Sequence, residues 1–219
     1  MINFGISAYL KLVSLNPQPQ RTELRKRLSP SDKAYDFHRS LRLHANRLLT
    51  HGDSIENVLD SVGRITKPAE RDSAQQGLRT LLNWRASNPV GIFEVKPHVY
   101  VSPNDVFKIS FTADFGTVIG GRKCAVHLWN TKRPPLAERL VTSTLSMLKP
   151  AYPEVDNIVV LSLLDSTLIS SLDDANAAAM GQRLAARIEE AILSVGEELH
   201  APAVVLRTPP STPQPAPRM

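Results

Sequence analysis

The chain has 219 residues, of which 42% are hydrophobic and 21% are charged, and its formal net charge is +5. This composition is typical of a globular protein and excludes a fibrous or wholly disordered chain. No apolar run approaches the roughly 20 residues needed to cross a bilayer, so we expect no membrane segment. The single cysteine, Cys124, excludes a disulfide framework and a multi-cysteine zinc site, and a cytoplasmic location is expected.

The amino-terminal part of the chain is basic and is interrupted by prolines. Residues 1–31 contain Pro17 and Pro19 in a breaker cluster and are expected to form a weakly ordered basic arm. Residues 32–66 are predicted to form a helical hairpin, which helix-turn-helix DNA readers also contain. The candidates for phosphate contacts are Arg25, Lys26, Arg27, Arg39 and Arg42. The alternative is a solvated helix face.

Residues 67–199 are predicted to form the core domain. Its elements are a helix over 68–85, strands over 91–101, 106–115 and 123–130, a helix over 136–148, a strand over 158–164 and a helix over 171–199. This order, α-β-β-β-α-β-α, predicts an α/β (α+β) fold with a mixed central sheet of about four strands flanked by helices, beside the amino-terminal helical segment.

Alternation along the predicted strands indicates which side chains share a face. In the second strand Phe107, Ile109 and Phe111 alternate with polar residues, and Gly120-Gly121 is a hairpin turn before the third strand. In the third strand Cys124, Val126 and Leu128 occupy one face. His127 and Trp129 occupy the other face, as core residues or as the wall of a site with a base-stacking platform.

The order of elements over about residues 68–165 resembles the core of the PD-(D/E)XK nuclease superfamily, the restriction-endonuclease-like fold. In that family an Asp on the second strand and a Glu/Asp-x-Lys on the third bind a divalent metal. The matching positions here are Asp114, Asn130 and Lys132. The resemblance implies a catalytic site in which Mg²⁺ bound by Asp114 and Asn130 activates water, with Glu94 as a further oxygen ligand.

Asn130 stands where the family has an acid, so the resemblance leaves two outcomes open. The domain is either a nucleic-acid-associated, metal-dependent phosphodiester hydrolase or a catalytically degenerate derivative of one. DNA is the expected partner of the basic segment. The alternative from another class is a non-catalytic α/β protein-interaction or regulatory module. The Pro-rich residues 200–219 are expected to form a disordered tail and to offer a docking segment for a protein partner.

Overall fold

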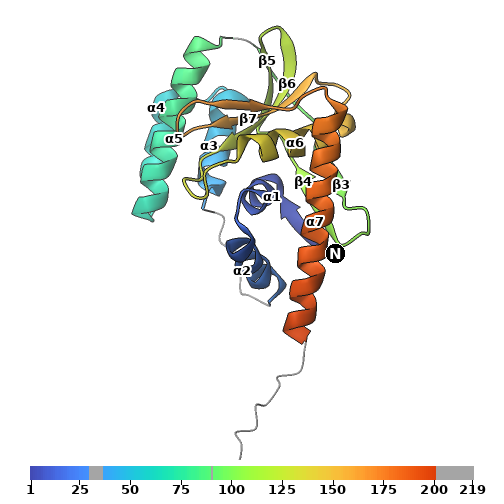
Figure 1. The fold of residues 1–219 in the computed structure, drawn as a ribbon. Helices are drawn as coiled ribbons and strands as arrows, with labels where there is room; N and C mark the ends of the chain where they lie inside the picture. Colours follow the sequence, from blue (N-terminus) through green and yellow to red (C-terminus); the bar gives the residue numbers. More distant parts are fainter. Residues whose placement is uncertain (30–36, 90, 201–219) are drawn as a thin grey trace, which may run out of the picture.

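The computed structural model describes residues 1–29, 37–89 and 91–200, and within these ranges it forms two sheets surrounded by helices (Figure 1). The strands are β1 (Ile2–Gly5), β2 (Ile92–Phe93), β3 (His98–Val101), β4 (Phe107–Phe111), β5 (Phe115–Ile119), β6 (Arg122–Trp129), β7 (Asn157–Ser162) and β8 (Leu168–Ser170). The helices are α1 (Ile6–Val13), α2 (Pro17–Leu28), α3 (Arg39–Leu49), α4 (Ile55–Gly63), α5 (Pro68–Ser87), α6 (Glu138–Leu148), the short 3-10 turn η1 (Lys149–Ala151) and α7 (Ala175–His200). The predicted α/β class is confirmed.

The larger sheet has the strand order β2-β5-β6-β7-β8 and mixed directions. β5 and β6 form the predicted antiparallel hairpin, whose turn residues Gly120 and Gly121 both have positive φ. β6 then pairs in parallel with β7 after the chain crosses over through α6. β2 and β8 add antiparallel strands at the two edges.

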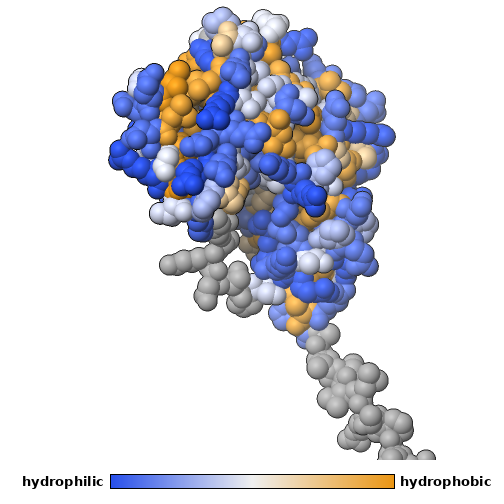
Figure 2. All heavy atoms as spheres, turned by 90° about the vertical axis from the view of Figure 1, so that its left-hand side faces the viewer, coloured by the Kyte–Doolittle hydropathy of each residue, from blue (hydrophilic) through white to orange (hydrophobic). Residues whose placement is uncertain are grey.

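Helices cover both faces of this sheet because β6 and β7 are apolar on both faces. Cys124, Val126 and Leu128 pack in one cluster with residues of α3, α4 and α5. Ala125 and Trp129 pack in the other cluster with α1, α6 and α7. The view onto the side of α4 and α5 has hydrophobic residues in patches among mostly hydrophilic ones (Figure 2). Within the described ranges, no helix combines the length and the apolar character that membrane crossing requires.

The expectation that residues 1–31 form a weakly ordered arm is wrong for residues 2–28. β1 runs parallel to β4 in a second sheet of order β1-β4-β3, and α1 and α2 follow it. Phe4, Tyr9 and Leu10 are completely buried, because the aromatic rings pack against Phe107 of β4. Pro17 does not break α2 but occupies its first turn, where the missing N–H is not needed.

Two of the predicted strands are divided between the two sheets. The predicted strand over 91–101 is interrupted before Pro97, which has no N–H to donate, and its halves are β2 and β3. The predicted strand over 106–115 ends at Phe111, and β5 begins at Phe115 in the other sheet. The mixed central sheet has five strands where about four were predicted, and β1, β3 and β4 form a second sheet of their own.

The remaining predicted segments lie partly outside the described residues. The hairpin of residues 32–66 is present as α3 and α4, where the Ser54 side chain caps α4, but its expected start at Asp32 lies outside the described residues. The expected Pro-rich tail lies outside them as well, except for His200, which ends α7.

Candidate functional site

A cavity of about 640 Å³ lies where the first turn of α1 meets α2, α3, the β4–β5 connection and β6. Residues 5–8 of the β1–α1 junction form part of its wall. The other lining residues are Arg27, Arg42, Asn46, Ser110, Thr112, Ala113, Asp114 and His127. The cavity therefore combines three hydroxyls, an imidazole, a carboxylate and two guanidinium groups.

Ser7 is placed by the turn from β1 into α1. The chain leaves β1 at Gly5, whose backbone is extended, and the helix begins at Ile6. Ser7 is consequently the second residue of α1 and is half-buried at the cavity wall. Its Oγ lies 2.7 Å from Nε2 of His127, which is 120 positions away in sequence.

His127 and Asp114 are brought together by the β5–β6 hairpin. Phe115 pairs with Val126, and the backbone N–H of Asp114 donates to the carbonyl of Val126 at 2.8 Å. This register places Asp114 Oδ2 2.9 Å from Nδ1 of His127, whose side chain is 3% exposed. The same carboxylate oxygen accepts the backbone N–H of Leu128 at 2.7 Å, so Asp114 is fixed from two directions.

The contact between His127 Nδ1 and Asp114 Oδ2 is close but is not a directed hydrogen bond. Among the described residues, Nδ1 is a buried nitrogen without a hydrogen-bond partner, although the carboxylate lies 2.9 Å away. Catalytic hydrogen bonds are often poorly aligned until a substrate binds. When the imidazole carries its proton on Nδ1, next to the carboxylate, Nε2 is the acceptor for the Ser7 hydroxyl.

The three residues have the order nucleophile, base and orienting acid. A serine hydroxyl becomes a useful nucleophile when an adjacent imidazole takes its proton and a carboxylate orients that imidazole. The first N–H groups of α1 have no acceptor within the helix, and no side chain caps them. These donors lie beside Ser7, and backbone N–H groups are of the type that stabilises negative charge on an attacked carbonyl oxygen.

Of the residues expected to bind metal, only Asp114 belongs to this cavity. Asn130 is buried, and its Nδ2 donates to the backbone carbonyl and the hydroxyl of Ser73 in α5, at 3.2 and 2.9 Å. Glu94 is exposed between β2 and β3. The structure therefore does not bring Asp114, Asn130 and Glu94 together, and this arrangement does not fit a shared Mg²⁺ site.

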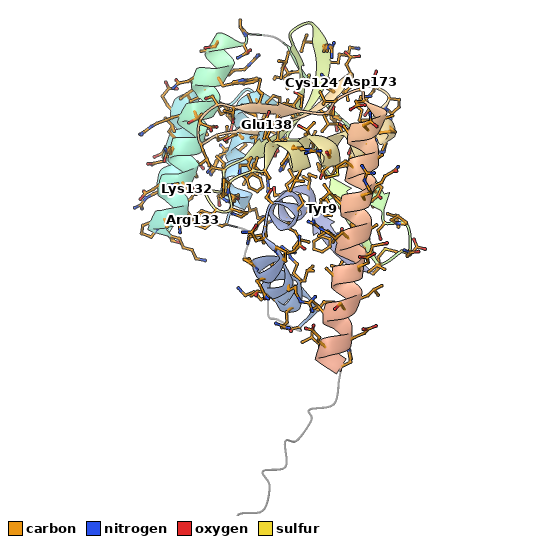
Figure 3. The ribbon with its side chains drawn as sticks, in the orientation of Figure 1. Tyr9, Cys124, Lys132, Arg133, Glu138 and Asp173 are labelled. Atoms are coloured by element: carbon orange, nitrogen blue, oxygen red, sulfur yellow. The ribbon has the colours of Figure 1, made fainter. Side chains whose placement is uncertain are left out.

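Lys132 is also separate from Asp114. It is exposed in the loop between β6 and α6, next to Arg133 (Figure 3). It lines a different cavity, of about 460 Å³, together with Glu138 and Asp165. In the described ranges, no three His, Cys, Asp or Glu side chains are grouped to hold a metal ion. The Mg²⁺ dependence stays a prediction.

The basic residues expected to bind phosphate are divided between different surroundings. Arg27 of α2 and Arg42 of α3 line the cavity. Arg25 instead forms an ion pair with Glu198 of α7 at 2.6 Å. Lys26 and Arg39 are exposed and are not among the lining residues.

Sequence reasoning missed the partnership of Ser7 with His127. His127 was expected in the core or at the wall of a site, and it belongs to both. Asp114 and His127 lie on opposite sides of a short predicted hairpin, and this placement in the sequence indicates that they are close together. Ser7 has no comparable signal, because its partner is remote in sequence and the surrounding segment contains no catalytic motif.

Comparisons with known proteins add no assignment. No family model matches the chain, and no curated protein matches it. A solved crystal structure, that of SSO0001, aligns with 90% of this chain and 96% of its own at 12% sequence identity and a TM-score of 0.32. A similarity at that TM-score supports no inference about fold or function, so function is inferred from the residues alone.

Proposed function

We propose that the chain is a hydrolase in which Ser7 is the nucleophile, His127 the general base and Asp114 the residue that orients the imidazole. The observation that carries the proposal is the continuous contact from Ser7 Oγ through His127 to Asp114, with links of 2.7 and 2.9 Å. Its support is strengthened by position, because all three residues line one cavity. Hydrogen-bonded serines and histidines also occur in ordinary cores, but those lack a cavity for a substrate.

The proposed reaction is the hydrolysis of an ester through an acyl-enzyme. Ser7 Oγ attacks the carbonyl carbon while its proton passes to Nε2 of His127, and the carbonyl electron pair moves to oxygen. When the C=O bond re-forms, the alcohol leaves with the proton from Nε2 and the acyl group remains on Ser7. Water then attacks the acyl carbon and gives its proton to Nε2. Ser7 recovers that proton as the acid departs.

A fluorophosphonate probe tests the proposal, because it labels activated serines with loss of fluoride. We expect labelling of Ser7 by peptide mass spectrometry, together with hydrolysis of p-nitrophenyl butyrate. Ser7→Ala should abolish both. Asp114→Asn, which keeps the acceptor for Leu128 N–H, should slow both by about 10²-fold or more because the imidazole loses its orienting charge.

Ser110→Ala is the matched control. Ser110 lines the same cavity but donates to Asn3 at 2.8 Å instead of contacting His127, so its variant should label normally at Ser7. Absence of label at Ser7, or equal labelling of wild type and Asp114→Asn, would contradict the proposal. Circular dichroism of each variant separates loss of chemistry from loss of fold.

A second proposal is the nucleic-acid-associated nuclease expected from the sequence. It is favoured by one observation, namely that Arg27 and Arg42 lie at the same cavity as Asp114. Cleavage of plasmid and single-stranded DNA that requires Mg²⁺ or Mn²⁺ and is lost in Asp114→Ala would support it. DNA binding that does not weaken with added salt would contradict phosphate contacts by these arginines. No activity in either assay would favour the non-catalytic module.

A further inference from the structure

β3 is an edge strand whose outer side pairs with no other strand of the described chain. It ends the sheet order β1-β4-β3 and pairs with β4 through its inner side alone. The N–H of Ser102 donates to the carbonyl of Phe107, and an antiparallel ladder uses every second residue in this way, so Tyr100 faces β4. The N–H and C=O groups of Val99 and Val101 therefore point away from the sheet. Among the described residues these groups have no hydrogen-bond partner.

A cavity of about 180 Å³ lies beside this free edge. It is formed between β3 and the end of α6, where Phe111, Met147 and Leu148 line it. The hydroxyl of Tyr152, which follows η1, donates to the carbonyl of Phe111 at 2.9 Å and accepts the N–H of His98 at 3.1 Å. These two bonds fix the end of η1 to the start of β3, so the cavity exists before a ligand binds. An apolar cavity of about 150 Å³ can hold a benzene molecule, and this cavity therefore suits one large apolar side chain.

The free edge and the cavity together select an extended peptide. An extended backbone presents N–H and C=O groups at the spacing of the edge, and its alternate side chains point to opposite sides. One side chain would enter the cavity on the side of Tyr100. Its two neighbours would lie beside Val99 and Val101, whose side chains are 54% and 44% exposed.

A second folded copy fits this edge less well than a peptide does. β3 has four residues and spans about 13 Å, so pairing along it buries far less than the roughly 1,200 Å² of a stable interface. Short contacts of this size are typical of transient recognition of an extended segment, in which main-chain bonds give affinity and a pocket gives specificity.

We infer that the groove between the free edge of β3 and the end of α6 binds an extended segment of a partner protein. The segment carries a large apolar side chain, such as leucine, between two β-branched ones. Its backbone pairs with Val99 and Val101, and its central side chain fills the cavity. The groove shares no lining residue with the Ser7 cavity, so this binding site is separate from the proposed hydrolase and does not depend on it.

A heptapeptide of sequence Lys-Thr-Val-Leu-Val-Thr-Lys, with fluorescein at its amino terminus and an amide at its carboxyl terminus, tests the inference. We expect saturable binding by fluorescence anisotropy. Methylation of the backbone nitrogens of its two valines keeps every side chain but removes the donors to β3, and should weaken binding by about tenfold or more. Replacement of its leucine by serine should weaken binding to a similar degree, because the cavity then loses its apolar occupant.

Two variants at one position provide the matched comparison. Val99→Pro removes an N–H that β4 does not use, and proline is tolerated at such edge positions, so this variant should fold but bind about tenfold or more weakly. Val99→Thr keeps the N–H and the branched side chain and should bind within about twofold of wild type. Circular dichroism checks both folds, and the methylated peptide on wild type keeps the test decisive if Val99→Pro does not fold.

Three results would overturn the inference. They are the absence of saturable binding, equal binding of the methylated and unmethylated peptides, and a dimer of the wild-type protein that Val99→Pro abolishes. Sedimentation velocity of the protein without peptide detects the dimer, which would assign the edge of β3 to a second copy of the chain.

Discussion

A single carboxylate oxygen of Asp114 contacts both the backbone of β6 and the imidazole of His127. Oδ2 accepts Leu128 N–H and also lies against Nδ1, while the Asp114 backbone pairs with Val126. The orienting residue of the proposed site is therefore part of the hairpin that carries the base. Cys124, two residues before Val126, has no such role, because burial raises the pKa of its thiol and keeps the thiolate scarce.

Glu189 is a buried carboxylate outside the site, on α7. It accepts hydrogen bonds from the backbone N–H and Nδ2 of Asn104, at 3.0 and 2.9 Å. Burial alone raises the pKa of this carboxyl, but hydrogen bonds from the Ser102 hydroxyl and Asn104 outweigh burial and hold the pKa below its usual value. The ionised form of Glu189 therefore stabilises the fold.

Glu189→Gln should lower the free energy of unfolding by about 1–3 kcal/mol at pH 7. A depressed folded-state pKa contributes stability that is complete above the unfolded value near 4.5 and is lost as the pH falls through the folded value. The difference between wild type and variant should therefore shrink below about pH 4. Urea unfolding at pH 7 and below about pH 4 measures this difference in the free energy of unfolding. Glu190→Gln, at the exposed neighbouring position, is the control and should have little effect. A difference independent of pH would contradict the assignment.

Single elements differ in how far the sequence predicts them. The position of β6 is predicted closely because both of its faces are apolar and buried. The alternation of its residues also predicts which side chains belong to each of the two core clusters. The strand over 106–115 was predicted as one element because Phe111 and Phe115 keep the same alternation. They pack in different clusters, however, since the chain changes sheets at residues 112–114. The hydrophobic periodicity of residues 106–115 does not indicate the change of sheet, because that change depends on contacts between β4 and β1.

The packing of α6 against α7 depends on the absence of a side chain at Gly181. A Cβ at this position would lie 2.2 Å from the backbone carbonyl oxygen of Ser143 and 2.7 Å from Cβ of Met147. Neither atom is the end of a flexible chain, so the two helices would have to move apart.

Gly181→Ala should therefore destabilise the protein by about 1–3 kcal/mol, although alanine is the better helix former. Gly196→Ala is the matched control on the same helix, because nothing lies within 4 Å of a Cβ there. It should be neutral or stabilising by up to about 1 kcal/mol. Denaturant unfolding compares them, and similar midpoints for the two variants would show that the helices adjust without cost.

At the scale of the whole molecule, the amino-terminal segment is part of the core. α1 packs against α6 and β4, with Tyr9 on the side of α7 (Figure 3). α2 is attached to the other end of α7 by ion pairs from Arg21 and Arg25 to Glu198. These pairs are largely exposed and should add little stability, so the apolar contacts of α1 hold the segment in place.

Leu10→Ala tests the contribution of this segment to the core. Leu10 is fully buried, so its truncation should cost about 2–5 kcal/mol in the free energy of unfolding. Leu43 on α3 is 58% exposed, and Leu43→Ala should cost less than about 0.5 kcal/mol. Chemical denaturation of the two variants provides the comparison. Equal costs would mean that α1 is not an integral part of the fold.

The parallel pairing of β1 with β4 has a consequence for biosynthesis. Ile2 leaves the ribosome long before its partner Phe107, and His127 follows still later. Until Phe107 and the rest of β4 have emerged, Phe4 and Leu10 have no partner surface to pack against and remain exposed on the nascent chain. Ser7 likewise stays without its base until His127 has been made. Under the proposed function, the protein becomes reactive only when the hairpin of β5 and β6 has emerged and packed against α1.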